Sequence, residues 1–134
     1  MSTVFTPFTK SISWTDSTTD ANGNPLPIGE TLADTVIGVR ADGDAAHGIG
    51  NYQYMAIIAA PAASVTPAAL NAAIGAANGQ SNFALAPGNY WLNGQQTDTL
   101  DGASATSSWG ATETPFSVPV PIVQPSNPTG FIVA

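Results

Sequence analysis

The sequence predicts a mainly β fold: a two-sheet sandwich of about seven short strands with one short inserted helix. Short alternating apolar stretches are separated by clusters of Gly, Pro, Asn and Asp, which is the pattern of strands joined by turns. In residues 83–92 a Pro-Gly pair divides an alternating apolar stretch from an aromatic one, as in a strand-turn-strand arch. A length of 134 residues fits a single domain. We expect this β-sandwich domain to span residues 1–124 and a Pro-containing tail to span 125–134.

The first half of the chain is predicted to contain four strands. Strands are expected at 4–9 and 11–15, and Pro7 places the first of them at a sheet edge, where a missing N–H is harmless. After a long polar loop, β-branched and aromatic residues predict strands at 34–40 and 52–59, paired in the centre of a sheet. The Gly-rich connection between these two strands is expected to be a flexible hairpin tip.

The helix is predicted at 67–77. Thr66 can cap its N-terminus, and Pro67 suits the first helical turn. Leu70 and Ile74 stand four residues apart among alanines, so they lie on one face. The Asn-Gly pair that follows is expected to end the helix.

Later strands are predicted before and after the Pro-Gly turn. The apolar residues from Phe83 form one strand, and 90–97 forms the next. The segments 103–109 and 116–123 are expected to form one broken last strand, whose prolines favour a sheet edge.

Three short motifs resemble the fibronectin type III pattern in its bacterial and phage versions: Ile12-Ser-Trp14-Thr, Leu85-Ala-Pro87-Gly88-Asn-Tyr90 and the polar run 98–108. The resemblance implies an immunoglobulin/fibronectin III-like antiparallel β-sandwich. In it, Trp14 and Leu85 pack in the core, and the Tyr90 hydroxyl bonds back to the preceding loop. The third strand, Val36-Ile37-Gly38-Val39, lacks the tyrosine usual in that family. A jelly-roll or another immunoglobulin-like sandwich stays open.

The charge balance excludes several classes of partner. Lys10 and Arg40 are the two cationic residues, against nine acidic ones, and the formal net charge is −7. Phosphate backbones and anionic lipid surfaces are therefore not expected to bind. No stretch approaches the ~20 apolar residues of a membrane span, and the first residues do not form a conventional secretion signal. The absence of cysteine excludes disulfides, thiolate nucleophiles and zinc-thiolate sites.

No catalytic residue, cofactor or metal site is predicted. His47, the one histidine, lies in a Gly-rich loop, whereas a catalytic base must be rigidly oriented. The stretch Asp20-Ala-Asn22-Gly-Asn24 is similar to the start of a calcium loop, but Pro25 follows and no glutamate stands at the twelfth position. Turn formation explains these side chains, although calcium binding in an Asp-rich turn stays open.

Candidate interface residues are aromatic or apolar. Trp91 follows Tyr90 and is expected on the opposite face of their strand, where the helix covers it or a partner contacts it. Trp109, beside Gly110, could anchor a loop or an interface. Three further candidates lie near the end of the sequence: Phe131, Ile132 and Val133. We expect these residues either to fold back on the domain or to dock in a neighbouring subunit.

These features favour a structural, non-enzymatic protein. The expected function is that of a virion component of a tailed phage, most specifically a capsid decoration protein docked through its termini and loops. The expected partners are capsid or other virion proteins, with repeated copies or a homo-oligomer on a particle assembled in the host cytoplasm. The alternative is an extracellular carbohydrate-binding or adhesive module that uses Trp91, Trp109 or Tyr52 as a stacking platform.

Overall fold

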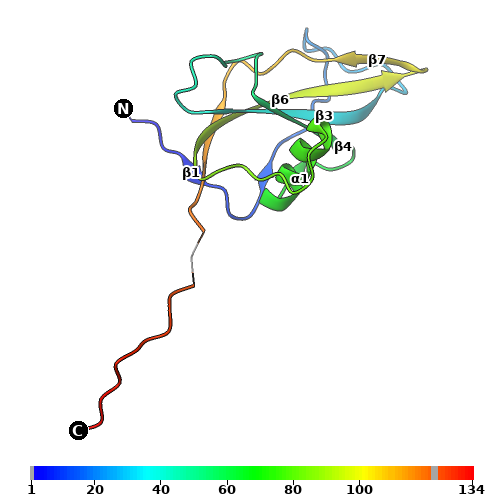
Figure 1. Ribbon diagram of the computed structural model, residues 1–134. Coiled ribbons are helices and arrows are strands. Elements are labelled where there is room, and N and C mark those ends of the chain that lie inside the picture. The colour runs from blue at the N-terminus through cyan, green and yellow to red at the C-terminus, as the bar shows by residue number, and fades with distance from the viewer. Residues whose placement is uncertain (1, 122–123) are drawn as a thin grey trace.

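The computed structural model describes residues 2–121 and 124–134 (Figure 1). Nine elements follow one another along the chain: β1 (Thr6–Pro7), β2 (Ile12–Ser13), β3 (Thr31–Ala41), β4 (Tyr54–Ala59), β5 (Ser64–Val65), α1 (Pro67–Asn78), β6 (Gly88–Leu100), β7 (Ala103–Thr106) and β8 (Thr114–Val118).

One six-stranded sheet forms the body of the protein, in the order β1-β8-β6-β3-β4, with β7 also paired to β6. The long strands β3 and β6 lie antiparallel at its centre, where Val39 pairs with Leu92 and Ile37 with Gly94. The short strands β2 and β5 make a separate two-stranded sheet. The centre of the large sheet is therefore built from residues far apart in the sequence.

The core lies on one face of the large sheet. Residues opposite one another in antiparallel strands share a face, so the side chains of Ile37, Val39 and Tyr90 point to the same side. Leu70 and Ile74 of α1 are fully buried against this side. The core includes further residues from β4, β8, the two-stranded sheet and the connecting segments: Phe8, Ala56, Val65, Leu85 and Phe116.

The predicted mainly β fold with one helix is confirmed. The second layer differs from the predicted sheet, because it combines α1 with only two short strands. The expected antiparallel arrangement is wrong at one sheet edge, where β1 pairs with β8 in parallel.

The helix forms where the sequence predicts it, one residue longer. The hydroxyl of Thr66 accepts a hydrogen bond from the backbone N–H of Ala69 at 3.2 Å, and Pro67 occupies the first turn. At the other end Gly79 adopts the left-handed conformation with φ of 68° and bonds back to the carbonyl of Gly75. These local signals are why the sequence alone locates this element well.

Other elements differ from the prediction. Residues from Phe83 to Ala86 form no strand, because the Leu85 N–H bonds the side chain of Asn71 on α1 instead of a neighbouring strand. The predicted broken last strand is two separate elements: β7 forms a hairpin with β6, while β8 lies between β1 and β6 and is not an edge. The expectation of a central position for β4 is also wrong, since it is the last strand of the sheet.

The residues predicted for the core have these positions. Leu85 and Tyr90 are buried, and the Tyr90 hydroxyl donates a hydrogen bond to the carbonyl of Ala86 at 2.6 Å. Tyr90 also stacks on Phe116. Trp14 is half-buried against the core, and its indole N–H donates to Asp16.

We predict that Tyr90→Phe lowers the free energy of unfolding by about 1 kcal/mol or somewhat more. The substitution removes a buried hydrogen bond and leaves the Ala86 carbonyl without this donor. Urea denaturation followed by fluorescence measures the change. Tyr54→Phe is the matched control, because the Tyr54 hydroxyl makes no hydrogen bond within residues 2–121 and 124–134. Equal stability of wild type and Tyr90→Phe would contradict the structural role of this hydroxyl.

Candidate functional site

Trp91 lies on the face of the sheet opposite to the core, as strand alternation predicts. The helix does not cover it, since α1 packs on the other face. Phe5 contacts its ring edge-on at a centroid distance of 5.3 Å, and the Arg40 guanidinium lies 5.6 Å from the ring centroid. Its indole N–H donates to the Asp42 carboxylate at 2.9 Å. Trp91 is therefore engaged within the domain.

Trp109 lies on the same face and rests beside Tyr52, with ring centroids 4.7 Å apart. The two rings occupy the space above Gly38, where a Cβ would come within 2.5 Å of the Tyr52 ring. Asn93 holds the loop after Trp109, since its amide donates to the Gly110 carbonyl and its oxygen accepts from the Gly110 N–H. Tyr52 and Trp109, and not a second sheet, therefore cover this part of the face opposite the core.

A partly buried ion pair lies between these aromatic groups. The Arg40 guanidinium makes a bidentate contact with the Glu113 carboxylate, at 2.6 and 2.8 Å. The hydrogen bonds from Arg40 hold the pKa of Glu113 below its usual range, against the opposing effect of burial. The Tyr52 hydroxyl is buried nearby without a hydrogen-bond partner in the described part of the chain, and burial raises its pKa.

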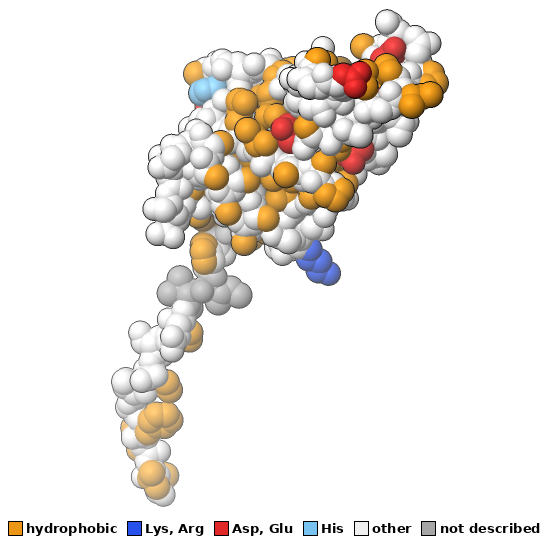
Figure 2. All heavy atoms as spheres, turned by 90° about the vertical axis from the view of Figure 1, so that its right-hand side faces the viewer, with side chains coloured by type: hydrophobic (Ala, Val, Ile, Leu, Met, Phe, Trp, Pro, Cys, Tyr) orange, Lys and Arg blue, Asp and Glu red, His pale blue; other side chains and the backbone are white. Residues whose placement is uncertain are grey.

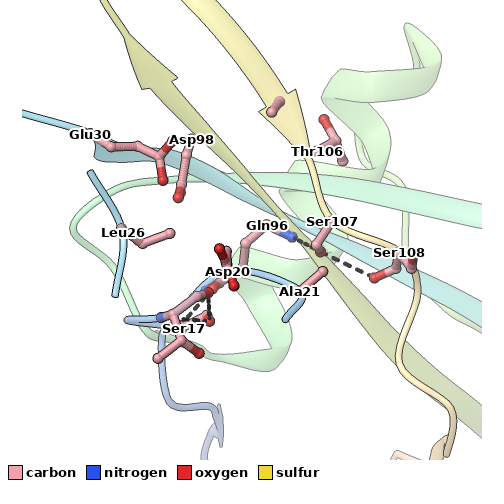
Figure 3. A pocket seen from close by; sticks show the side chains of 12 residues that line it. Ser17, Asp20, Ala21, Leu26, Glu30, Gln96, Asp98, Thr106, Ser107 and Ser108 are labelled. Carbon is pink, nitrogen blue, oxygen red and sulfur yellow. Dashed lines mark hydrogen bonds between the residues drawn. The ribbon is translucent and has the colours of Figure 1, made fainter. Parts of the chain in front are cut away.

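An open groove of about 470 Å³ lies beside β6 and β7 (Figure 3). Gln96 of β6 lines the groove and connects the loop after β2 to the large sheet. Its side chain accepts a hydrogen bond from the Ser17 N–H at 2.8 Å and donates one to the Asp16 carboxylate at 2.7 Å. Short hydroxyl side chains line one wall, among them Thr106, Ser107 and Ser108.

Two carboxylates face each other on the opposite side of the groove, Glu30 and Asp98 (Figure 3). Desolvation raises the pKa of Glu30, and the neighbouring Asp98 raises it further. His47 does not line the groove, so the arrangement brings no imidazole base to these acids.

The polar loops considered in the sequence use their side chains locally. The His47 ring lies 2.6 Å from the Asp44 carboxylate, whose pKa is lowered by a backbone hydrogen bond from Ala46 and by His47. The Asp20 carboxylate accepts hydrogen bonds from the backbone N–H groups of Asn22 and Asn24. Both arrangements stabilise turns.

Residues 2–121 and 124–134 contain no group of three or more His, Asp or Glu side chains placed to hold a metal ion. The helix α1 has twelve residues, and no helix within residues 2–121 and 124–134 is long and apolar enough to cross a membrane. The chain matches no protein-family model, and neither the curated proteins nor the solved structures contain a significantly similar protein.

The residues of the tail segment, Gln124–Ala134, form no helix or strand and are all exposed. Figure 2 shows the segment as a narrow extension that leaves the body, with hydrophobic side chains along it. Phe131, Ile132 and Val133 are 85%, 91% and 97% exposed. Of the candidate interface residues, these three contrast with Trp91 and Trp109, which contact other parts of the domain.

Sequence reasoning missed a second exposed apolar surface, on β4. Met55 and Ile57 are 42% and 57% exposed on the outer face, while Tyr54, Ala56 and Ile58 face the core. Because both faces of this strand are apolar, alternation gave no sign that one of them is open. The sequence alone did not show that β4 lies at the edge of the sheet.

We predict that Gly38→Ala destabilises the protein by about 1–3 kcal/mol, because the added methyl group overlaps the Tyr52 ring and forces it to move. Denaturation curves measure the effect. Gly48→Ala is the matched control, since its added Cβ meets no atom within 4 Å, and we expect a change within about 0.5 kcal/mol. A Gly38→Ala variant as stable as wild type would show that the aromatic pair is loosely packed.

We predict that Glu113→Gln destabilises the protein at pH 7 and that this loss shrinks in acid. The folded-state pKa of Glu113 is depressed, so its stabilising contribution is present above the unfolded pKa, about 4.3, and is lost as pH falls through the lower folded value. Urea denaturation of both proteins between pH 7 and pH 3 measures the difference.

Glu30→Gln is the control for the acid experiment. The folded-state pKa of Glu30 is raised, so its ionised form opposes folding and its substitution should not destabilise at pH 7. A loss of stability in Glu113→Gln that is the same at every pH would exclude a stabilising charge interaction with Arg40.

Proposed function

We propose that this protein is a structural, non-enzymatic component of a large particle, to which it docks through the tail segment and its loops. The particle we propose is the virion of a tailed phage, with this chain as a capsid decoration protein. The exposure of Phe131, Ile132 and Val133 in an extended segment is the single observation that carries the proposal.

An extended apolar segment of this kind suits docking. Soluble monomers rarely expose neighbouring large apolar side chains in a row, and such segments commonly order on a partner by adding a strand to its sheet. The tail segment contains no charged side chain, so no side-chain charge has to be desolvated when it docks.

The energetics favour docking on a surface that offers many sites. Burying three such side chains contributes roughly 5–9 kcal/mol, at about 1.5–3 kcal/mol each. Ordering the backbone of four residues costs roughly 4–8 kcal/mol, at about 1–2 kcal/mol each. One tail therefore attaches weakly by itself, and avidity arises where copies that are linked to one another dock together on the particle.

Several further features support a virion accessory protein. Most of the surface is polar and uncharged, with charged residues at 8% of the chain, and the sequence contains no cysteine, which suits assembly in a host cytoplasm. Docked copies would stabilise the particle by mass action, since they bind the assembled state alone. We extend the proposal to the fold: the short motifs around Trp14 and Tyr90 support kinship with fibronectin type III-like modules, with α1 and the two-stranded sheet as a reduced second layer.

The alternative, a carbohydrate-binding or adhesive module, is less well supported. A stacking platform needs aromatic rings with a free face, but Trp91 contacts Phe5 and Arg40. Tyr52 is buried beneath Trp109. These contacts leave the tail segment as the better supported binding element.

We predict that deletion of residues 125–134 abolishes attachment to the particle and leaves the fold intact, since no core side chain lies in this segment. The assay is co-sedimentation of purified protein with virions that lack it, from the phage whose genome encodes the chain. Circular dichroism and the free energy of unfolding check that the deletion variant folds.

Two substituted chains sharpen the attachment assay. Serine at positions 131, 132 and 133 keeps the length of the tail and should also prevent attachment. Ile28→Ser removes an apolar side chain that is fully exposed on the body and should not affect attachment. Unchanged attachment of the deletion variant would refute docking through the tail, and absence of the chain from purified virions would refute the virion role.

A further inference from the structure

The sheet ends at β4 with an open edge. β4 pairs with β3 along one side, from Tyr54 opposite Val39 to Ala59 opposite Asp34. Within the described part of the chain, no segment other than β3 makes a β-ladder with it. The outward backbone groups of this strand are therefore available to a further strand.

This edge lacks the usual protection against pairing. Natural proteins block exposed edges with lysine, proline, an inward charge or a bulge, and the six residues of β4 contain none of these. The opposite side of the sheet is different: β1 and β8 contain Pro7 and Pro115, and β7 is short with four small exposed residues. An edge such as β4 is a template for pairing with a further strand.

The same chain carries a segment suited to this edge. Residues Gly130–Ala134 make no strand in the structure, yet Phe131, Ile132 and Val133 have high β propensity and no charge. In an added strand, alternate side chains point to opposite faces. One set would lie beside Met55 and Ile57 on the outer face, and the other beside Ile58 at the rim of the core.

We propose that the tail segment of one copy pairs along β4 of a second copy of this chain, so that the copies link tail to edge. The inference rests on the proposed docking role of the tail and names its receiver. The molecule offers both halves of the interface, an unprotected apolar edge and a detached apolar strand. Neither half contains a charged side chain that would select a different partner.

In the structure the tail does not lie along the edge of its own domain. It follows β8, which is separated from β4 by β6 and β3, and it runs away from the sheet (Figure 1). A head-to-tail link of this kind leaves one free edge and one free tail on each pair, so it continues from copy to copy into rings or chains. Such repetition matches a protein present in many copies on a particle.

Single-cysteine cross-linking tests the pairing directly, because the natural chain has no cysteine. Full-length Ile57→Cys is mixed under mild oxidation with full-length Phe131→Cys, Ile132→Cys or Val133→Cys, one chain of each pair carrying a mass tag. We expect a disulfide-linked heterodimer roughly tenfold above background, because pairing raises the local concentration of the two thiols. The yield should alternate along the three tail positions, since a disulfide needs Cβ atoms on one face.

Ser104→Cys is the matched control for the edge position, since it lies in β7, an exposed and polar strand at the opposite side of the sheet. It should give background cross-linking with all three tail variants. Sedimentation velocity on full-length protein without cysteine should show association that increases with concentration and is reduced by Ile57→Lys. Heterodimer yields equal to the Ser104→Cys control, or a chain that stays monomeric, would overturn the inference.

The outcome separates this inference from the proposed function. Attachment to virions that depends on the tail, combined with background cross-linking at position 57, would show that the tail docks on a different virion protein and would overturn the homotypic link alone. Cross-linking at position 57 without attachment to virions would support the link between copies and overturn the virion role.

Discussion

The pairing of β3 with β6 is the constraint on which the rest of the structure depends. It joins Thr31–Ala41 to Gly88–Leu100 over most of their lengths, with one irregularity between Leu32 and Asp34. Because side chains alternate along a strand, a slip of one residue would exchange the two faces. The present register places Val39 with Leu92 toward α1 and Gly38 with Asn93 toward the other side. The core and the opposite face are therefore fixed together.

The face opposite the core is covered without a second sheet. At its centre the chain has Gly38, and the absence of a Cβ lets the rings of Tyr52 and Trp109 lie against the backbone. Arg40 and Glu113 fill the neighbouring space as a paired charge, which costs less than either group buried alone. Aromatic and ionic side chains from two loops, together with Arg40 of β3, thus replace the sheet that a symmetrical sandwich would place there. This leaves the outer face of β4 uncovered.

The sequence allowed accurate prediction wherever the signal was local. Thr66, Pro67 and Gly79 act through their own backbone conformation, so the helix and both its ends could be located. Prediction was less successful where pairing depends on distant residues. Phe83 and Leu85 alternate like a strand, but Asn71 of the helix takes the N–H that a strand neighbour would have bonded. Likewise, both faces of β4 are apolar, and nothing within its six residues indicates that β3 is its one neighbour in the sheet formed by residues 2–121. The bidentate contact between Arg40 and Glu113 joins residues that are 73 positions apart in the sequence, and no sequence motif predicts it.

The shortage of cations explains why the edge of β4 stays open. Lysine is the common device for blocking a strand edge, but this chain has one lysine, Lys10, and its one arginine is paired with Glu113. The net charge of −7 opposes close approach of two copies in dilute salt, although at physiological ionic strength it is screened beyond about 8 Å. Uncharged segments that meet at shorter distance then decide whether copies associate. In the proposed link between copies those segments are β4 and residues 130–134, and neither contains a charged side chain that would have to be desolvated.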